Sequence, residues 1–238
     1  MVRKQLQRYL RILNTVSNRM NILSIDVSGN YSSISLLIGD EVNTFTQTHA
    51  RKDRPDWDTL FSRIGFISKE GFDNLDALAF ARGPGSYTAL RITASFLKAI
   101  AVAKHLPLIA ISNLDSLAHE ARHWINDAQA KILVAIEADA KESYFCSYQK
   151  NKDEIVPLAA ESVLSMEDLL DLANQGDCYF VGTGWPESIQ SHPNYLSNAI
   201  GSSESIAIIA KQKFNTGNIF DPEDANPVYL KTPEYQKK

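Results

Sequence analysis

The sequence contains little cysteine and no long apolar run. Only Cys146 and Cys178 occur among its 238 residues, which argues against a disulfide scaffold and fits a reducing cytoplasm. No apolar stretch approaches the ~20 residues that a membrane-spanning helix needs, so we expect no membrane insertion. Hydrophobic residues make up 44% and charged residues 22% of the chain. These values predict an ordinary soluble globular protein of one large domain or two small ones.

Acidic residues outnumber basic ones beyond the first twenty residues. The formal net charge is −4, which gives no sign of a protein that binds nucleic acid by itself. Residues 1–20 carry five basic residues and no acidic one, so the rest of the chain carries −9. Their leucines recur at helical spacing, as in a basic amphipathic helix. Two interpretations stay open: a targeting or nucleic-acid arm, or a loosely attached tail from a start codon upstream of Met20.

The most informative segment spans residues 75–113. A buried-looking strand at 75–81 leads into Arg82-Gly83-Pro84-Gly85-Ser86, followed by a helix at about 87–104 and a strand at 107–111. This order predicts a right-handed βαβ unit with parallel strands. A glycine-rich turn before a helix gathers unpaired backbone N–H groups and can bind an anion. Alternatively, the glycines only supply unusual backbone angles.

The remaining patterns predict an α/β protein. Before the glycine turn we expect a meander of three strands and an amphipathic helix that begins at Pro55. The strands are expected at 21–27, 32–38 and 42–48. After the turn we expect helices at 114–126, 166–174 and 203–215, and strands at 131–137, 143–149, 154–163 and 178–181. Ser165 is a predicted N-cap, with Asp168 three residues later.

Five motifs, in this order, resemble those of one known family. They are ILSIDVSGNYSSISLL, ARGPGSYTALRI, EADAKESYF, VGTGW and PVYL. Over about residues 21 to 232 the chain resembles the TsaB (YeaZ) family of the bacterial tRNA threonylcarbamoyladenosine machinery. The resemblance implies a two-lobed actin/Hsp70/sugar-kinase-like (ribonuclease H-like) α/β fold with mixed sheets flanked by helices. We accordingly expect a first lobe at 21–115 and a second lobe at 116–238 whose tail returns to the first. The basic extension at 1–20 lies outside the resemblance and departs from the family.

The resemblance also implies a function and partners. Proteins of this family are non-catalytic scaffolds that pair with a catalytic TsaD-like subunit and a TsaE-like ATPase. The complex forms N6-threonylcarbamoyladenosine in tRNAs that read A-starting codons. We therefore expect a cytoplasmic pseudo-enzyme without a cofactor of its own, which homodimerises when alone and meets tRNA only through the complex. Any nucleotide would be shared at the partner interface.

The family places its partner interface on the helix from Pro55 and the helix from Tyr87. The residues predicted to contact the partner are Trp57, Leu60, Phe61, Ile64, Ile67, Leu90, Ala94, Leu97 and Ala101. Their spacing also fits a core stripe facing the chain's own sheet, and a helix this apolar can serve both neighbours. The turn Arg82, Gly83, Pro84, Gly85, Ser86 would then be a ligand or junction turn. Asp53-Arg54-Pro55 departs from the His-Ser-Glu-like start that is common in the family.

Two enzymatic alternatives remain. Asp26, Ser28 and Gly29 retain part of the phosphate hairpin of actin-like ATPases, so we interpret them as a vestigial nucleotide site. Asp139 could supply the second carboxylate that phosphoryl transfer needs, but Lys141 and Glu142 follow it where glycines are expected.

The other alternative is a zinc metallopeptidase. His119-Glu120-Ala121-Arg122-His123 fits the H-E-x-x-H pattern, in which two histidines on one helix face bind zinc. No third ligand is evident, and we expect both histidines to lie on a partly exposed helix. The prediction is therefore no catalytic residue and no metal.

Overall fold

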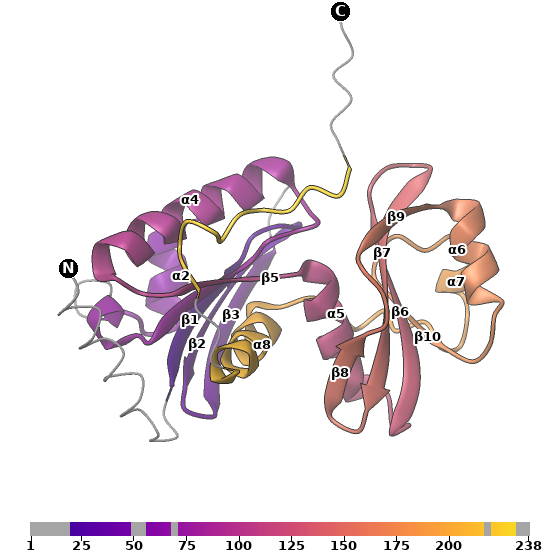
Figure 1. The fold of residues 1–238 in the computed structure, drawn as a ribbon, viewed down its shortest axis with the longest axis horizontal. Helices are drawn as coiled ribbons and strands as arrows, with labels where there is room; N and C mark the ends of the chain where they lie inside the picture. Colours follow the sequence, from indigo (N-terminus) through magenta and orange to yellow (C-terminus); the bar gives the residue numbers. More distant parts are fainter. Residues whose placement is uncertain (1–19, 49–55, 68–70, 217–219, 232–238) are drawn as a thin grey trace, which may run out of the picture.

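The structure, a computed structural model, describes residues 20–48, 56–67, 71–216 and 220–231. Residues 1–19 of the predicted basic extension and the predicted helix start at Pro55 therefore lie outside the described residues. The described chain forms two lobes, each built on one β-sheet with helices packed against it (Figure 1). This arrangement confirms the predicted two-lobed α/β fold. None of the described helices is long and apolar enough to cross a membrane.

The first sheet has the strand order β3-β2-β1-β4-β5. Its strands are β1 (Asn21–Asp26), β2 (Tyr31–Ile38), β3 (Glu41–Thr48), β4 (Ala77–Ala81) and β5 (Leu108–Ile111). The first three form the predicted antiparallel meander, because short polar turns join them. Strands β1, β4 and β5 run parallel, and helix α4 (Tyr87–Lys104) connects β4 to β5. The predicted βαβ unit is confirmed.

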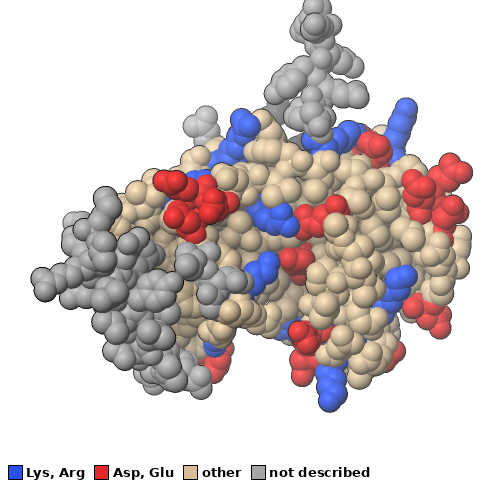
Figure 2. Space-filling model, in the orientation of Figure 1, with Lys and Arg blue, Asp and Glu red and all other residues tan. Residues whose placement is uncertain are grey.

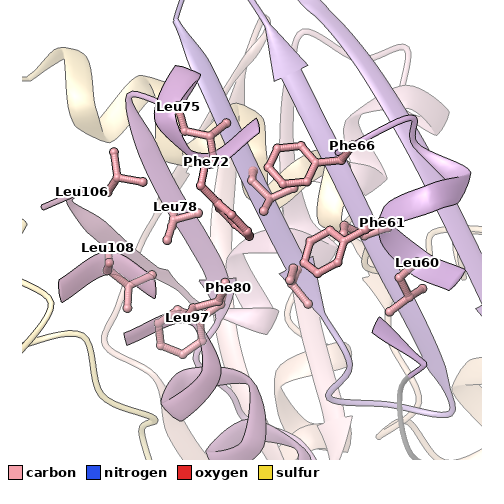
Figure 3. Close-up of a cluster of buried hydrophobic side chains, with 14 of the residues drawn as sticks. Leu60, Phe61, Phe66, Phe72, Leu75, Leu78, Phe80, Leu97, Leu106 and Leu108 are labelled. Atoms are coloured by element: carbon pink, nitrogen blue, oxygen red, sulfur yellow. The ribbon is translucent and has the colours of Figure 1, made fainter. Parts of the chain in front are cut away.

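One face of the first sheet is covered by α4, by helix α2 (Trp57–Arg63) and by the short 3-10 helix η1 (Phe72–Asn74). Their apolar side chains meet those of the sheet in one cluster (Figure 3). Phe61, Phe66 and Phe72 pack ring against ring, with centroids 4.9 to 6.0 Å apart. Burial of these rings stabilises α2 and η1 on the sheet.

Helix α8 (Ser203–Asn215) covers the opposite face of the same sheet. Ile206, Ala207 and Ala210 pack there against strands that lie more than ninety residues earlier in the sequence. The N-terminal end of α8 is held by buried serines. The Ser203 hydroxyl lies 2.7 Å from the hydroxyls of both Ser33 and Ser35. The expected lobe boundary near residue 115 stays a prediction, but α8 belongs spatially with the first sheet (Figure 1).

The second sheet has the order β10-β6-β7-β8, with β9 also paired to β7. Its strands are β6 (Gln129–Glu137), β7 (Glu142–Asn151), β8 (Glu154–Pro157), β9 (Ser162–Ser165) and β10 (Tyr179–Val181). Helix α5 (Asn113–Ala121) and the 3-10 helix η2 (Arg122–Trp124) lie on one side, and α6 (Met166–Ala173) and α7 (Glu187–Gln190) on the other. Leu114 and Ala118 of α5 pack on the sheet, as does Leu169 of α6.

Two element predictions for the second lobe need correction. The single strand expected at 154–163 is wrong, because the chain bends at 158–161 and pairs with β7 twice, as β8 and as β9. The helix expected at 114–126 ends at Ala121 and continues only as a 3-10 turn. By contrast, α6 begins with the predicted cap, in which Ser165 and Asp168 form a reciprocal capping box.

Candidate functional site

Asp26, at the end of β1, is bound by the turn that follows it. The residue is 1% exposed. Its Oδ1 accepts hydrogen bonds from the Ser28 amide at 2.9 Å and the Ser28 hydroxyl at 2.6 Å, and its Oδ2 accepts one from the Tyr31 hydroxyl at 2.8 Å. Burial raises the pKa of Asp26, and the hydrogen bonds from Ser28 and Tyr31 oppose that rise. Both carboxylate oxygens are thus engaged inside the protein.

The glycine turn packs directly onto this first turn. The Ser86 amide donates to the Ser28 carbonyl at 2.9 Å. A Cβ atom at Gly85 would lie 2.9 Å from the Cβ and carbonyl oxygen of Ser28, so only glycine allows this approach. The close packing leaves no room for a phosphate between Ser28 and Gly85.

Asn113, the first residue of α5, ties the two turns together. The side-chain oxygen of Asn113 accepts a hydrogen bond from the Gly83 backbone amide at 3.0 Å. The backbone amide of Asn113 donates to the Gly83 carbonyl at 2.9 Å. Its side-chain nitrogen donates to the Ser28 hydroxyl. Gly83 has a φ of +108°, which a side chain rarely tolerates. The Gly83 and Ser86 amides are therefore both bound within the chain.

Arg82 connects the glycine turn to the second lobe. Its guanidinium lies 2.6 Å from the Glu161 carboxylate, which precedes β9. Its backbone is bonded on both sides, since its amide donates to Ile111 at 2.7 Å and its carbonyl accepts from the Val228 amide at 2.9 Å. Arg82 is thus a junction between the first lobe, the second lobe and the C-terminal segment.

Asp139, in the turn between β6 and β7, is also engaged. Its Oδ1 accepts from the amides of Lys141 and Glu142, at 2.8 and 3.1 Å. Its Oδ2 pairs with the ammonium of Lys231, which also binds Glu142. The hydrogen bond from Lys231 lowers the pKa of Asp139. The carboxylate considered for an ATPase is therefore held by a lysine and by its own turn.

The H-E-x-x-H motif is divided between α5 and η2. His119 is 4% exposed, so the expectation of a partly exposed helix position is wrong for it. Its Nδ1 lies 2.8 Å from the Ser205 hydroxyl, and Glu120 accepts from Ser202 and Ser205 at 2.7 and 2.6 Å. His123 is exposed in η2, because α5 ends before it. Within the described ranges, no three His, Cys, Asp or Glu side chains are grouped as metal ligands.

Most of the residues predicted for the partner interface face the chain's own core (Figure 3). The buried ones are Leu60, Phe61, Ile64, Leu90, Ala94, Leu97 and Ala101. Trp57 is half-buried and stacks on Phe96 with the ring centroids 4.5 Å apart. Only Ile67 is well exposed, at 71%. Contact by these side chains with a partner stays a prediction, and the buried ones stabilise the helices that would carry it.

A second stripe on α4 was missed by the sequence analysis. It consists of Thr88, Ile92, Ser95, Ala99 and Val102. These residues follow one another at spacings of four and three, so they share one face of the helix. Val102 is 59% exposed, although it is a large apolar residue. The same spacing is visible in the sequence, and it would have identified this face once the core-facing stripe was assigned.

The chain is similar to proteins of known family. The family model described as "TsaD: tRNA N6-adenosine threonylcarbamoyltransferase" matches residues 65–197, more than half of the chain. The protein named tRNA threonylcarbamoyladenosine biosynthesis protein TsaB from Escherichia coli (strain K12) is 30% identical over 228 residues, which cover 92% of this chain and 98% of that protein. The protein of the same name from Haemophilus influenzae is 28% identical over 92% of this chain and 97% of its own length.

A solved structure resembles the fold over nearly the whole chain. It is described as YeaZ from Pseudomonas aeruginosa and has a TM-score of 0.73 at 26% sequence identity. The match covers 89% of this chain and 100% of that one. The similarity therefore extends through both lobes.

Proposed function

This chain belongs to the TsaB (YeaZ) family, and we propose that it serves tRNA threonylcarbamoyladenosine biosynthesis as a non-catalytic scaffold. In this proposal it pairs with a TsaD-like catalytic subunit and, through that pair, with a TsaE-like ATPase in the cytoplasm. It meets tRNA only within the complex. When alone, it homodimerises through the face that otherwise binds the TsaD-like subunit. It has no cofactor of its own, and any nucleotide at the Arg82 turn is shared with the partner.

The observation that supports a scaffold most directly is the state of Asp26. An ATPase of this fold type needs a carboxylate that can reach a metal-bound phosphate or the attacking water. Here Ser28 and Tyr31 already bind both oxygens of that carboxylate. Asp139, the other candidate, is held by Lys231 and by its own turn. The carboxylates of Asp26 and Asp139 therefore stabilise the fold of this chain, whereas an ATPase would need them free to act on the metal or the water.

The exposed stripe of α4 supports a partner surface. Ile92 and Val102 face solvent beside small residues, which allow another helix to approach closely. Val102 lies ten residues, about 15 Å, along the helix from Ile92. A surface of this length with apolar ends suits a helix-pairing interface.

We expect Val102→Glu to weaken binding of the TsaD-like subunit from the same organism at least about tenfold, because the charge would be buried without a partner. The dissociation constant can be measured by calorimetry with both purified proteins. Leu158→Glu is the matched control, since Leu158 is similarly exposed, at 52%, but follows β8 in the second lobe. Sedimentation of the isolated proteins should show that Val102→Glu weakens the homodimer and that Leu158→Glu does not.

Equal binding by Val102→Glu and the wild type would exclude the α4 face as the interface. Failure of the wild type itself to bind the TsaD-like subunit would overturn the scaffold proposal. Leu97 is unsuitable for this experiment, because it is completely buried and its substitution would unfold the lobe.

The isolated chain should hydrolyse ATP no faster than the Asp26→Asn variant. This substitution keeps the size of the side chain and removes the carboxylate that a metal or water would need. Phosphate release from the two purified proteins, each with Mg²⁺, gives the comparison. Hydrolysis by the wild type that is lost in Asp26→Asn would identify an enzyme instead of a scaffold.

A further inference from the structure

The C-terminal segment 220–231 is fastened along the first lobe (Figure 1). Ala225 is buried in the core beneath α4. The Lys98 ammonium donates to the Asn226 side-chain oxygen at 2.6 Å, and the Arg91 guanidinium donates to the Tyr229 hydroxyl at 3.0 Å. The Tyr229 ring packs on Tyr87 with the centroids 4.8 Å apart. These contacts combine apolar burial with hydrogen bonds, so this part of the segment is firmly held.

A groove of about 260 Å³ lies between α4 and the segment. Two cationic side chains, Arg91 and Lys98, line it. Both are already bound to the segment, through Tyr229 and Asn226. We therefore interpret this groove as the seam along which the segment is attached, with its polar groups used for that attachment.

The end of the segment crosses to the second lobe. The Lys231 ammonium binds the carboxylates of Asp139 and Glu142, which both lie in the turn between β6 and β7. All three side chains are more than a third exposed. Exposed ion pairs contribute little stability and weaken as salt screens them. The second-lobe end of the segment is therefore its weakly held end.

Arg82 couples this segment to a second contact between the lobes. The Val228 amide binds the Arg82 carbonyl at 2.9 Å, while the Arg82 side chain binds Glu161 at 2.6 Å. One residue thus holds the C-terminal segment with its backbone and the second lobe with its side chain. Figure 2 shows basic and acidic side chains beside one another near the middle of the molecule, where the lobes meet.

Helices α5 and α8 hold the lobes together by polar contacts of a different kind. His119 and Glu120 of α5 bind Ser205 of α8, and these groups are largely buried. Buried hydrogen-bonded groups resist separation more than exposed ion pairs do. Arg82 and Glu161 are less exposed than the Lys231 pairs, at 25% and 14%, so the lobes can part first at Lys231 while α5 and α8 stay in contact.

We propose that residues 225–231 form a releasable clasp that holds the two lobes closed at the Arg82 turn. Release of Lys231 frees the carboxylates of Asp139 and Glu142, loosens the Val228–Arg82 bond, and lets the second lobe rotate about the α5–α8 contact. The clasp is a conformational device of the isolated chain, and it does not depend on the function proposed above.

Hydrogen exchange followed by mass spectrometry on the full chain tests the clasp. Lys231→Glu should raise the exchange rate of peptides covering 225–231 and 138–143 at least about fivefold, because it removes both exposed ion pairs of Lys231. Glu161→Gln should raise exchange in 225–231 as well, because the Glu161 carboxylate binds the Arg82 side chain. The double variant Lys231→Glu/Glu142→Lys should restore part of the slow exchange, because it reverses one of the two ion pairs and leaves Asp139 unchanged.

Lys104→Glu is the matched control. Lys104 is as exposed as Lys231, at 34%, but its partner Asp73 lies in the same lobe. This variant should leave both peptides unchanged. Unaltered exchange in Lys231→Glu would overturn the clasp. So would a Glu161→Gln variant in which 225–231 exchanges as in the wild type, because the two contacts would then be independent.

Discussion

Gly182→Ala should lower the free energy of unfolding by about 3–5 kcal/mol, the sum of backbone strain and overpacking. Gly182 follows β10 with a φ of +95°, in the region that disfavours side chains. A Cβ atom there would lie 2.2 Å from the carbonyl oxygen of Ala135 in β6. That oxygen cannot move away easily, because it also accepts the Gly184 amide at 2.9 Å. Urea denaturation at neutral pH measures the loss.

Gly176→Ala separates the cost of backbone strain from the cost of steric overlap. Gly176 also has a positive φ, +136°, but no atom beyond its two chain neighbours lies within 4 Å of its Cβ position. We expect this variant to lose only about 1–2 kcal/mol, from strain alone. Equal losses in the two variants would show that contact between Gly182 and β6 contributes nothing, and would contradict the close packing of the VGTGW turn on that strand.

The second large expected effect is a loss of stability at acidic pH, caused by His119. Burial, with smaller contributions from the nearby Arg122 and His123, lowers the pKa of His119 to about 3. In the unfolded chain this pKa is about 6.5. Between these values the unfolded chain binds a proton that the folded chain does not, so the free energy of unfolding falls as the pH falls below about 6.5. From pH 7 to pH 4 the loss from this residue alone is about 3 kcal/mol.

His119→Asn provides the comparison. Asparagine does not titrate in this range, and its side-chain nitrogen can still donate a hydrogen bond to the Ser205 hydroxyl, whose own proton is donated to Glu120. The free energy of unfolding should therefore depend less on pH in the variant, whatever its stability at pH 7. Asp26 acts in the opposite direction, because its raised pKa favours proton binding by the folded chain. Since both proteins contain Asp26, its effect cancels. Parallel pH profiles for variant and wild type would contradict a neutral buried His119.

The sequence predicted the positions of helices and strands along the chain better than the way these elements pack against one another. Helices α4 and α8 were expected at the residues they occupy, since long periodic segments give strong signals. The split between β8 and β9 was not foreseen, because the bend at 158–161 contains no glycine and only tertiary pairing with β7 reveals it. The place of α8 on the first sheet rests on bonds between residues about 170 positions apart, which no local pattern encodes.

The candidate site was predicted to a similar degree. The motifs identified both turns, but they could not show that Asn113 joins Gly83 to Ser28. Helix α4 is apolar on more than one face, so its composition alone could not decide between Leu97, which is buried, and Val102, which is exposed. That choice depends on how the helix rotates against β4 and β5.

The position of α8 has a consequence for synthesis of the protein. Strands β1, β4 and β5 are translated by residue 111, but the helix that covers one face of their sheet ends at residue 215. At about 5–20 residues per second, a ribosome needs roughly 5–20 s to make the intervening chain. During that time Ile22, Ala79 and Ile109, which α8 buries in the finished protein, have no cover from it. The first lobe therefore finishes folding only after the whole second lobe has left the ribosome.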